Sequence, residues 1–360
     1  MPSITVANGA SIHYEDSGAV PGVAYTTLIL VHGMGFNGGV FKKLHPIAPA
    51  HKFRTVAINR RDYAPTSPFT EDERKLLTAG GESHRRHLRN LGLELAQFID
   101  KFATENDLPP ATESGEGGVV PLGWSLGGLN IHAFLSALDE VDDDILARLN
   151  KWIRALVIHD TSPVGIGLAN PPEYDIQLWF NPDLDIRFTN FKDWAVAYYK
   201  HKDIHSGKND TLTYNQPFEF TPDKLAELNL LVHERKPTFH EISAEELKEL
   251  TSAEVYGGSD TLIIFSSLDL TKDEIRRSLF NRALAAKLPN AKVRYIGGAE
   301  TAGVMIYALW ELQKGLDDPS LWGGEKARDV KIIYTPTGNH FSFWDDPEEA
   351  LVQYRRAIVE

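Results

Sequence analysis

Short apolar runs that alternate with helical segments are the feature that most constrains the fold of this 360-residue chain. Residues 26–33, 54–62, 119–125 and 153–160 each contain an apolar run of strand length. Such runs are typical of strands that are buried on both faces, as in parallel sheets. In residues 81–102, by contrast, the apolar positions recur at helical spacing. The alternation predicts an α/β fold with a mostly parallel central sheet flanked by helices.

The two ends of the chain extend this pattern. Asn8-Gly9 lies between alternating apolar residues, which predicts an antiparallel hairpin. Strands at 291–298 and 330–335 resume the alternation, and each is followed by a helical segment. A capping box at 271–274 predicts that a helix begins there and continues to about residue 288.

The alternation is interrupted by an aromatic-rich segment. We expect residues 161–260 to form an inserted, mostly helical cap, and residues 1–160 and 261–360 to form the core. A pocket under such a cap would be lined by apolar side chains with few polar anchors. We predict four aromatic substrate-binding residues, one beside the candidate nucleophile described below and three in the cap: Trp124, Trp179, Trp194 and Tyr198.

Composition excludes several classes of function. The chain has 37 basic and 50 acidic residues, a formal net charge of −13, which argues against nucleic acid and anionic membranes as partners. It has no cysteine, so thiolate catalysis and disulfides are excluded. The first residues lack the basic start and apolar stretch of a signal peptide, and no apolar run is long enough for a membrane span, so we expect a cytoplasmic protein. Nothing in the sequence indicates an oligomeric state.

A G-x-S-x-G motif, Gly123-Trp124-Ser125-Leu126-Gly127, lies between a predicted strand and a predicted helix. Glycines on both sides of the serine allow the chain to turn sharply and other segments to pass close beneath it. The turn then presents the hydroxyl at the carboxyl edge of the sheet. We predict that Ser125 is a nucleophile and that the Leu126 amide, at the start of the helix, binds an oxyanion.

Two further motifs follow predicted strands. His32-Gly33-Met34-Gly35 comes directly after a buried strand, and its glycines allow backbone amides to face an anion. We predict the Met34 amide as the second oxyanion donor. His340 lies in a loop after the last predicted strand, from which a histidine can reach the serine and act as general base.

With these motifs in this order, the chain resembles the α/β-hydrolase family. The matching segments are the hairpin start, 32–35, 123–128 and 338–350, and residues 59–63 with Ser67-Pro68 resemble a fungal branch of the family. The resemblance implies an α/β-hydrolase fold, a Ser-His-acid triad, an oxyanion hole and a variable cap. It leaves the substrate open, because this fold hosts many reactions.

Three carboxylates are candidates for the acid of the triad. Asp160 ends a buried strand, where its charge would need a partner such as His340. Glu300 follows strand 291–298, and one helix and one strand fit between it and His340. Asp269 precedes the predicted helix at 271 and is interpreted as a helix-start residue. We prefer Asp160, with Glu300 and Asp269 as the alternatives.

These residues predict a serine hydrolase that cleaves an ester or lactone of a largely apolar small molecule through an acyl-enzyme. A C–C bond or amide hydrolase with the same triad, and a small-molecule sensor that retains the triad, are the alternatives. No phosphate loop or dinucleotide glycine pattern is present, so we expect no cofactor. Two histidine pairs, 84/87 and 201/205, lack a suitably spaced carboxylate, so we expect solvated helix faces and no metal.

Overall fold

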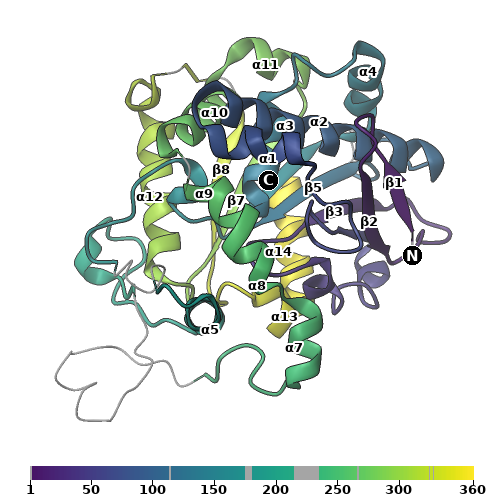
Figure 1. The fold of residues 1–360 in the computed structure, drawn as a ribbon. Helices are drawn as coiled ribbons and strands as arrows, with labels where there is room; N and C mark the ends of the chain where they lie inside the picture. Colours follow the sequence, from purple (N-terminus) through teal and green to yellow (C-terminus); the bar gives the residue numbers. More distant parts are fainter. Residues whose placement is uncertain are drawn as a thin grey trace, which may run out of the picture.

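A single eight-stranded sheet forms the centre of the computed structural model, with strand order β1-β2-β4-β3-β5-β6-β7-β8 (Figure 1). The strands β1 and β2 form the predicted hairpin, and β2 runs antiparallel to β4. All the other pairs are parallel, which confirms the predicted α/β class and mostly parallel sheet. The structure describes residues 2–112, 115–174, 181–214, 235–265, 267–323, 325–326 and 328–360. The strands are β1 (Ser3–Thr5), β2 (Ser11–Asp16), β3 (Thr26–Val31), β4 (Phe53–Ile58), β5 (Val119–Trp124), β6 (Ala155–His159), β7 (Lys292–Gly298) and β8 (Val330–Thr335).

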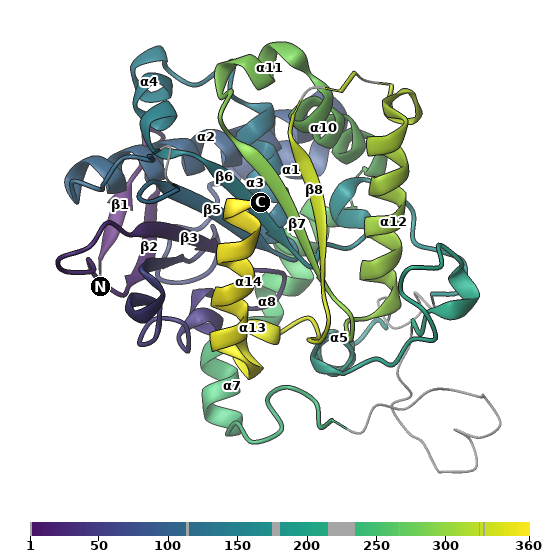
Figure 2. The same ribbon diagram turned by 180° about the vertical axis from the view of Figure 1, so that it is seen from behind.

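Helices cover both faces of this sheet (Figures 1 and 2). On one face α2 and α10 pack against α3, which contacts β5 and β6, and on the other face α14 contacts β6 and β7. The central strands β3, β4 and β5 are therefore buried along their whole length, as their continuous apolar sequences predict. The helices before β6 and after α9 (Thr261–Phe265) are α1 (Glu71–Ala79), α2 (Gly81–Glu105), α3 (Gly127–Ser136), α4 (Asp143–Trp152), α10 (Leu268–Phe280), α11 (Arg282–Lys287), α12 (Gly303–Asp317), α13 (Ser342–Asp345) and α14 (Pro347–Val359).

A long segment separates β6 from α10. Its described part consists of short helices and loops, and α5, α7 and α8 lie in the lower half of Figure 1. It ends in a π-helical turn that leads into α9. The elements are α5 (Leu184–Val196), α7 (Ala244–Leu250), α8 (Ala253–Val255), the π-helical turn (Tyr256–Asp260) and α9 (Thr261–Phe265).

The helix expected to begin at Thr271 begins earlier, so that prediction is wrong. Ser267 is the N-cap of α10 and accepts a hydrogen bond from the third residue of the helix, whereas Thr271 is buried inside α10. The capping box does not form because Glu274 faces α2, where its carboxylate lies 3.4 Å from Arg85 and 3.6 Å from Arg89. The helix also ends sooner than expected, and α11 begins as a separate helix.

The histidine pairs also differ from expectation. His84 and His87 are buried rather than solvated, and the His87 ring packs on Phe69 with ring centroids 4.9 Å apart. His201 and His205 lie in a loop. Among the described residues, no group of three or more histidine, aspartate or glutamate side chains could hold a metal ion. Within the same residues, no helix has both the length and the apolar character needed to cross a membrane.

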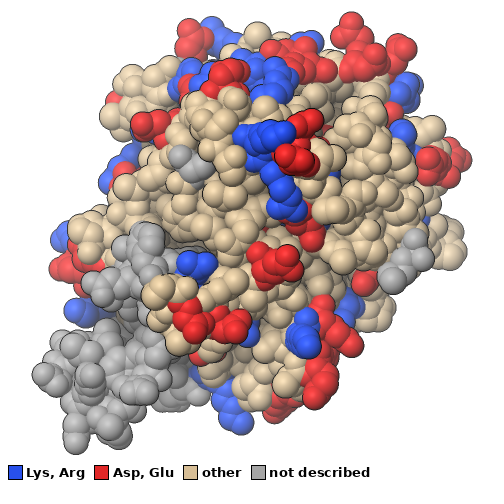
Figure 3. Space-filling view, viewed as in Figure 1, with Lys and Arg blue, Asp and Glu red and all other residues tan. Residues whose placement is uncertain are grey.

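The surface drawn in Figure 3 carries acidic and basic side chains that are interspersed, with uncharged residues over most of its area. Many of the charges are paired. For example, Arg86 and Arg89 both contact Glu140, and Arg277 contacts Asp139. On this face the acidic side chains are distributed and do not form one acidic patch.

Three buried histidines predict that the protein loses stability in mild acid. Burial lowers the pKa of His132 to about 3 and the pKa values of His87 and His159 to about 4. Between about pH 6.5 and these values the unfolded chain binds protons that the folded chain does not. The contribution of these histidines to the free energy of unfolding is therefore fully present above about pH 6.5. It falls as the pH drops, by up to ~1.4 kcal/mol per pH unit for each histidine.

Urea unfolding at about pH 7 and about pH 5.5 measures this effect. In the wild type the neutral His132 ring bonds both Ser278 of α10 and Tyr295 of β7. Because glutamine does not titrate, His132→Gln should show a smaller difference in the free energy of unfolding between the two pH values. An equal free energy of unfolding at both pH values in the wild-type protein would contradict the prediction.

Candidate active site

Ser125 occupies a sharp turn between β5 and α3. Its φ of 54° lies in the left-handed region, which is uncommon for a residue with a side chain. The glycines of the motif are needed for close packing: a Cβ on Gly123 would lie 2.3 Å from the Gly127 carbonyl oxygen, and one on Gly127 would lie 2.2 Å from the Val31 carbonyl oxygen. The chain thus passes beneath Ser125 at a distance that no larger residue allows, and the strained turn matches the arrangement expected for a nucleophile.

The loop after β3 passes directly beside this serine. A Cβ on Gly33 would lie 2.8 Å from the Ser125 Cβ, so the predicted oxyanion loop and the predicted nucleophile are in contact. Met34 and Leu126 line the same pocket as Ser125. Among the described residues, neither backbone N–H of these two has a protein acceptor. Buried amides normally have a hydrogen-bond partner. Two that lack one at the same pocket are therefore available to bind an anion.

His340 contacts Asp160. Its Nδ1 lies 2.5 Å from the Asp160 Oδ2, and the Thr301 hydroxyl donates a hydrogen bond of 2.6 Å to the same oxygen. Both side chains of the pair are buried. Asp160 follows β6 and His340 follows β8, so two strand ends of the same sheet bring the residues together. With Nδ1 donating to the carboxylate, Nε2 is left as the proton acceptor of the ring.

Ser125 and His340 both line this pocket. In the described part of the chain no hydrogen bond joins their side chains, and such bonds are often long before a substrate binds. The geometry therefore brings together Ser125, His340, Asp160 and the two amide donors that the sequence predicts.

The two alternative acids lie elsewhere. Glu300 accepts hydrogen bonds from the Gly338 N–H at 2.7 Å and from Arg235 at 2.9 Å, so it holds the loop that precedes His340. Asp269 lies in the first turn of α10, which is the helix-start position expected for it. Of the three candidate carboxylates, Asp160 is the one whose oxygen contacts the imidazole.

Trp124 lies beneath the histidine and is not part of the pocket lining. Its indole N–H donates a 2.8 Å hydrogen bond to the His340 carbonyl oxygen, and the two rings are 4.9 Å apart between centroids. Asn339 holds the other side of the loop, because its amide donates to the Val196 carbonyl oxygen and to the Thr238 hydroxyl. These residues fix the backbone on both sides of the imidazole.

The pocket at Ser125 contains about 460 Å³ of space, part of it open to solvent. Trp194 lines it, as predicted, whereas Tyr198 lies outside the lining and donates a 2.6 Å hydrogen bond to Asp345. Trp179 lies outside the described residues. None of the described lining residues is an aspartate, glutamate, lysine or arginine. The lining consists of Met34, Ser125, Leu126, Ser162, Val164, Asn170, Tyr174, Phe191, Trp194, Ile264, Phe265, Val304, Met305 and His340.

Sequence reasoning missed the residues that support this site. Thr301 and Asp260 have no local motif that marks them, and Asn339 and Arg60 lie in segments that resemble the family but were assigned no role. Thr301 directly follows Glu300. This strand end could therefore be identified from the sequence, but Thr301, the residue that contacts Asp160, could not. The partners of all four side chains are distant in the sequence, and only the folded arrangement reveals them.

Comparisons with known proteins concern the family and the fold of the chain. Residues 28–354 match the model of a family described as the alpha/beta hydrolase family. No curated protein matches the chain. A hydrolase from Pseudomonas aeruginosa PA01 is similar in structure, with 15% identity and a TM-score of 0.50 over 99% of this chain and 97% of that chain.

Two other solved structures have a similar likeness. A putative aryl esterase from Burkholderia cenocepacia has 14% identity and a TM-score of 0.50, covering 99% of this chain and 96% of its own. The enzyme AqDC, described as recognising and ring-cleaving the Pseudomonas quinolone signal, has 14% identity and a TM-score of 0.52, covering 100% of this chain and 99% of its own. At these identities the likeness concerns the fold.

Proposed function

Because the chain belongs to the alpha/beta hydrolase family, we propose that it is a serine hydrolase that cleaves an ester or lactone bond of a largely apolar small molecule. The observation that carries the proposal is the meeting of Ser125, His340 and two unpaired backbone amides at one apolar pocket. A nucleophile, a base and oxyanion donors at one point are the parts that acyl transfer requires.

The reaction follows from these positions. The Ser125 hydroxyl attacks the carbonyl carbon while His340 Nε2 accepts its proton. The amides of Met34 and Leu126 stabilise the negative oxygen of the tetrahedral intermediate. His340 then protonates the leaving alcohol, and water, activated by the same imidazole, hydrolyses the acyl-enzyme. Asp160 keeps the imidazole in one tautomer and stabilises its cation throughout.

Part of the pocket wall comes from the segment proposed as a cap, residues 161–260. Ser162, Tyr174, Phe191 and Trp194 of this segment line the pocket. Met305 of α12, which lies outside this segment, lines the same pocket. We therefore assign to the cap the role of covering Ser125 and selecting the substrate by shape and apolar character.

The apolar lining predicts strong discrimination against charged acyl groups. The value of kcat/KM for p-nitrophenyl valerate should exceed that for the p-nitrophenyl monoester of glutarate by about 100-fold or more, because an unpaired carboxylate in an apolar pocket costs several kcal/mol. Trp194→Ala should weaken the preference, since it shortens the apolar wall. A faster reaction with the charged ester would contradict the proposed substrate class.

A screen of p-nitrophenyl esters and macrocyclic lactones tests the activity itself, with a serine-directed fluorophosphonate as control. We expect turnover of at least one neutral ester or lactone and loss of that turnover after labelling. Labelling without turnover of any ester or lactone would contradict the proposed reaction.

A further inference from the structure

A buried arginine lies behind the candidate oxyanion loop. Arg60 follows β4, and its Nη2 donates hydrogen bonds to the Gly33 carbonyl oxygen at 3.1 Å and to the Asp260 carboxylate at 2.7 Å. Arg60 is 7% exposed and Asp260 is 1% exposed. Burying a charged pair costs free energy unless its hydrogen bonds have good geometry. The hydrogen bonds of this pair are therefore a guide to its role.

His32 contacts the same carbonyl oxygen. Its Nε2 accepts a 2.9 Å hydrogen bond from the Arg60 backbone N–H, so the proton of the neutral ring is on Nδ1. That Nδ1 lies 2.9 Å from the Gly33 carbonyl oxygen and donates to it. Complete burial lowers the pKa of His32 well below its usual range, which keeps the ring neutral. The Gly33 carbonyl oxygen thus accepts two hydrogen bonds, one of them from a cation.

This carbonyl and the Met34 N–H belong to one peptide group. Because a trans peptide is planar, its C=O and N–H point in opposite directions. Holding the carbonyl toward Arg60 and His32 therefore aims the N–H away from them, on the side of the pocket. Hydrogen bonds from charged donors are also the stronger ones, and they polarise the group that accepts them.

Asp260 secures the loop on the other side of Met34. Its Oδ2 accepts hydrogen bonds from the Gly35 N–H at 3.0 Å and from the Tyr63 hydroxyl at 2.5 Å. Asp260 is the last residue of the π-helical turn that closes the inserted segment. Turns of this kind are frequent at functional sites. One carboxylate thus joins the end of the insertion, the arginine and the oxyanion loop.

We propose that Arg60, held by Asp260, is a positioning residue that aims the Met34 N–H into the active-site pocket and strengthens it as an oxyanion donor. The inference rests on the proposed function, because that function assigns the oxyanion to Met34. Because Asp260 lies at the end of the inserted segment, the position of this segment affects how the Met34 N–H is aimed.

The sequence offers a direct spectroscopic test. The chain has three methionines, and Met34 is the one that follows a glycine. Labelling glycine at the carbonyl carbon and methionine at the amide nitrogen therefore gives a single coupled signal, from the Gly33–Met34 peptide. In Arg60→Met this carbon and nitrogen should shift upfield, in the direction of a lost hydrogen bond, and Asp260→Asn should cause a smaller shift in the same direction.

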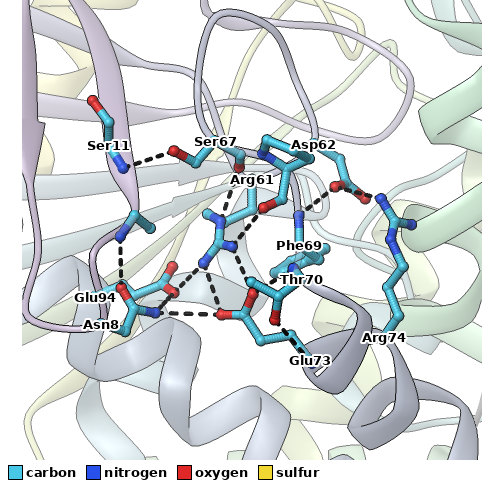
Figure 4. Close-up of polar contacts among 12 residues, drawn as sticks. Asn8, Ser11, Arg61, Asp62, Ser67, Phe69, Thr70, Glu73, Arg74 and Glu94 are labelled. Carbon is cyan, nitrogen blue, oxygen red and sulfur yellow. Dashed lines mark hydrogen bonds and ion pairs between the residues drawn. The ribbon is translucent and has the colours of Figure 1, made fainter.

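Arg61 provides the matched control. It is adjacent in sequence and similarly buried, but its ion pairs are with Glu73 at 2.8 Å and Glu94 at 2.6 Å (Figure 4). Arg61→Met should destabilise the protein and leave the Gly33–Met34 signal in place. If Arg60→Met does not fold, Asp260→Asn carries the test, because it retains the side-chain volume. An unchanged signal in folded Arg60→Met or folded Asp260→Asn would overturn the proposal.

Kinetics give a second readout. Loss of an oxyanion donor costs about 10²–10³-fold in kcat, and a donor that is only misaligned should cost less, about 10–100-fold, with KM little changed. Affinity for a trifluoromethyl ketone, which presents an oxyanion, should fall by the same factor, whereas Arg61→Met should keep both values per folded molecule. A wild-type protein that cleaves no ester but whose signal moves in Arg60→Met would reject the proposed function and retain the positioning. Full kcat and an unmoved signal in Arg60→Met would reject the positioning alone.

Discussion

Replacing Ser125 with alanine should lower the turnover of a neutral p-nitrophenyl ester by up to about 10⁶-fold, as expected when one member of a triad that acts as a unit is lost. The alanine has no hydroxyl to attack the carbonyl, while the pocket and both oxyanion amides stay in place. Binding of the ester should therefore change little. Because the backbone strain at Ser125 is the same for alanine as for serine, we also expect Ser125→Ala to fold as well as the wild type.

The matched control is Ser136→Ala. Ser136 lies on α3, the helix that begins just after Ser125, and it is buried away from the pocket lining. Its replacement removes a hydroxyl of the same kind from the helix that follows the nucleophile turn and should leave kcat within about threefold, as for most changes remote from a site. Wild-type turnover in Ser125→Ala, or a comparable loss in Ser136→Ala, would remove Ser125 from the mechanism.

Asp160→Asn should lower kcat by about 10⁴-fold with the fold intact, because an amide can hold the imidazole in the wrong tautomer. In the wild type the carboxylate accepts from His340 Nδ1 at 2.5 Å, which leaves Nε2 free to take the serine proton. An asparagine that donates its own N–H to Nδ1 would place the histidine proton on Nε2 instead. The variant should retain the hydrogen bond from Thr301, so its stability should change less than its activity.

Two isosteric variants serve as controls for this prediction. Asp269→Asn alters the first turn of α10 and should retain wild-type kcat. Glu300→Gln keeps an oxygen that can accept from the Gly338 N–H, so its loss should stay below about tenfold. A loss of 10⁴-fold in Glu300→Gln together with near-normal turnover in Asp160→Asn would reverse the assignment of the acid.

The sheet and the nucleophile turn could be predicted from sequence because their causes are local. The continuous apolar runs of β3 and β5 specify buried strands, and the G-x-S-x-G pattern around Ser125 is itself a local signal, although Gly127 also packs against the distant Val31 carbonyl oxygen. The hairpin at Asn8-Gly9 is equally local, and its register pairs Ile4 with Ile12. Such features depend little on what the rest of the chain does.

Features that depend on tertiary contacts were predicted less well. The expected start of α10 at Thr271 failed because Glu274 is attracted to arginines of α2, which local sequence does not reveal. His84 and His87 are buried because α1 and Phe69 cover α2. Trp124 and Tyr198 were expected to bind substrate, yet their polar atoms are engaged by His340 and Asp345. In each case a partner distant in the sequence determines where the side chain points.

The acid of the triad could be predicted only partly from the local sequence. The cost of burying an unpaired carboxylate at the end of β6 favoured Asp160, and the contact with His340 agrees with that physical argument. The pair Arg60–Asp260 had no such signal, because its two residues are far apart in the sequence and neither lies in a recognised catalytic motif. The role of a buried arginine can be inferred only when its hydrogen-bond partners are known.

Mass spectrometry of the protein after reaction with a fluorophosphonate, with peptide mapping of the adduct, identifies the nucleophile directly. We expect one adduct per chain, on Ser125, formed rapidly in the wild type and much more slowly in Asp160→Asn, since labelling needs the same activated hydroxyl. An adduct on another residue, or labelling of Ser125→Ala at the wild-type rate, would contradict this assignment.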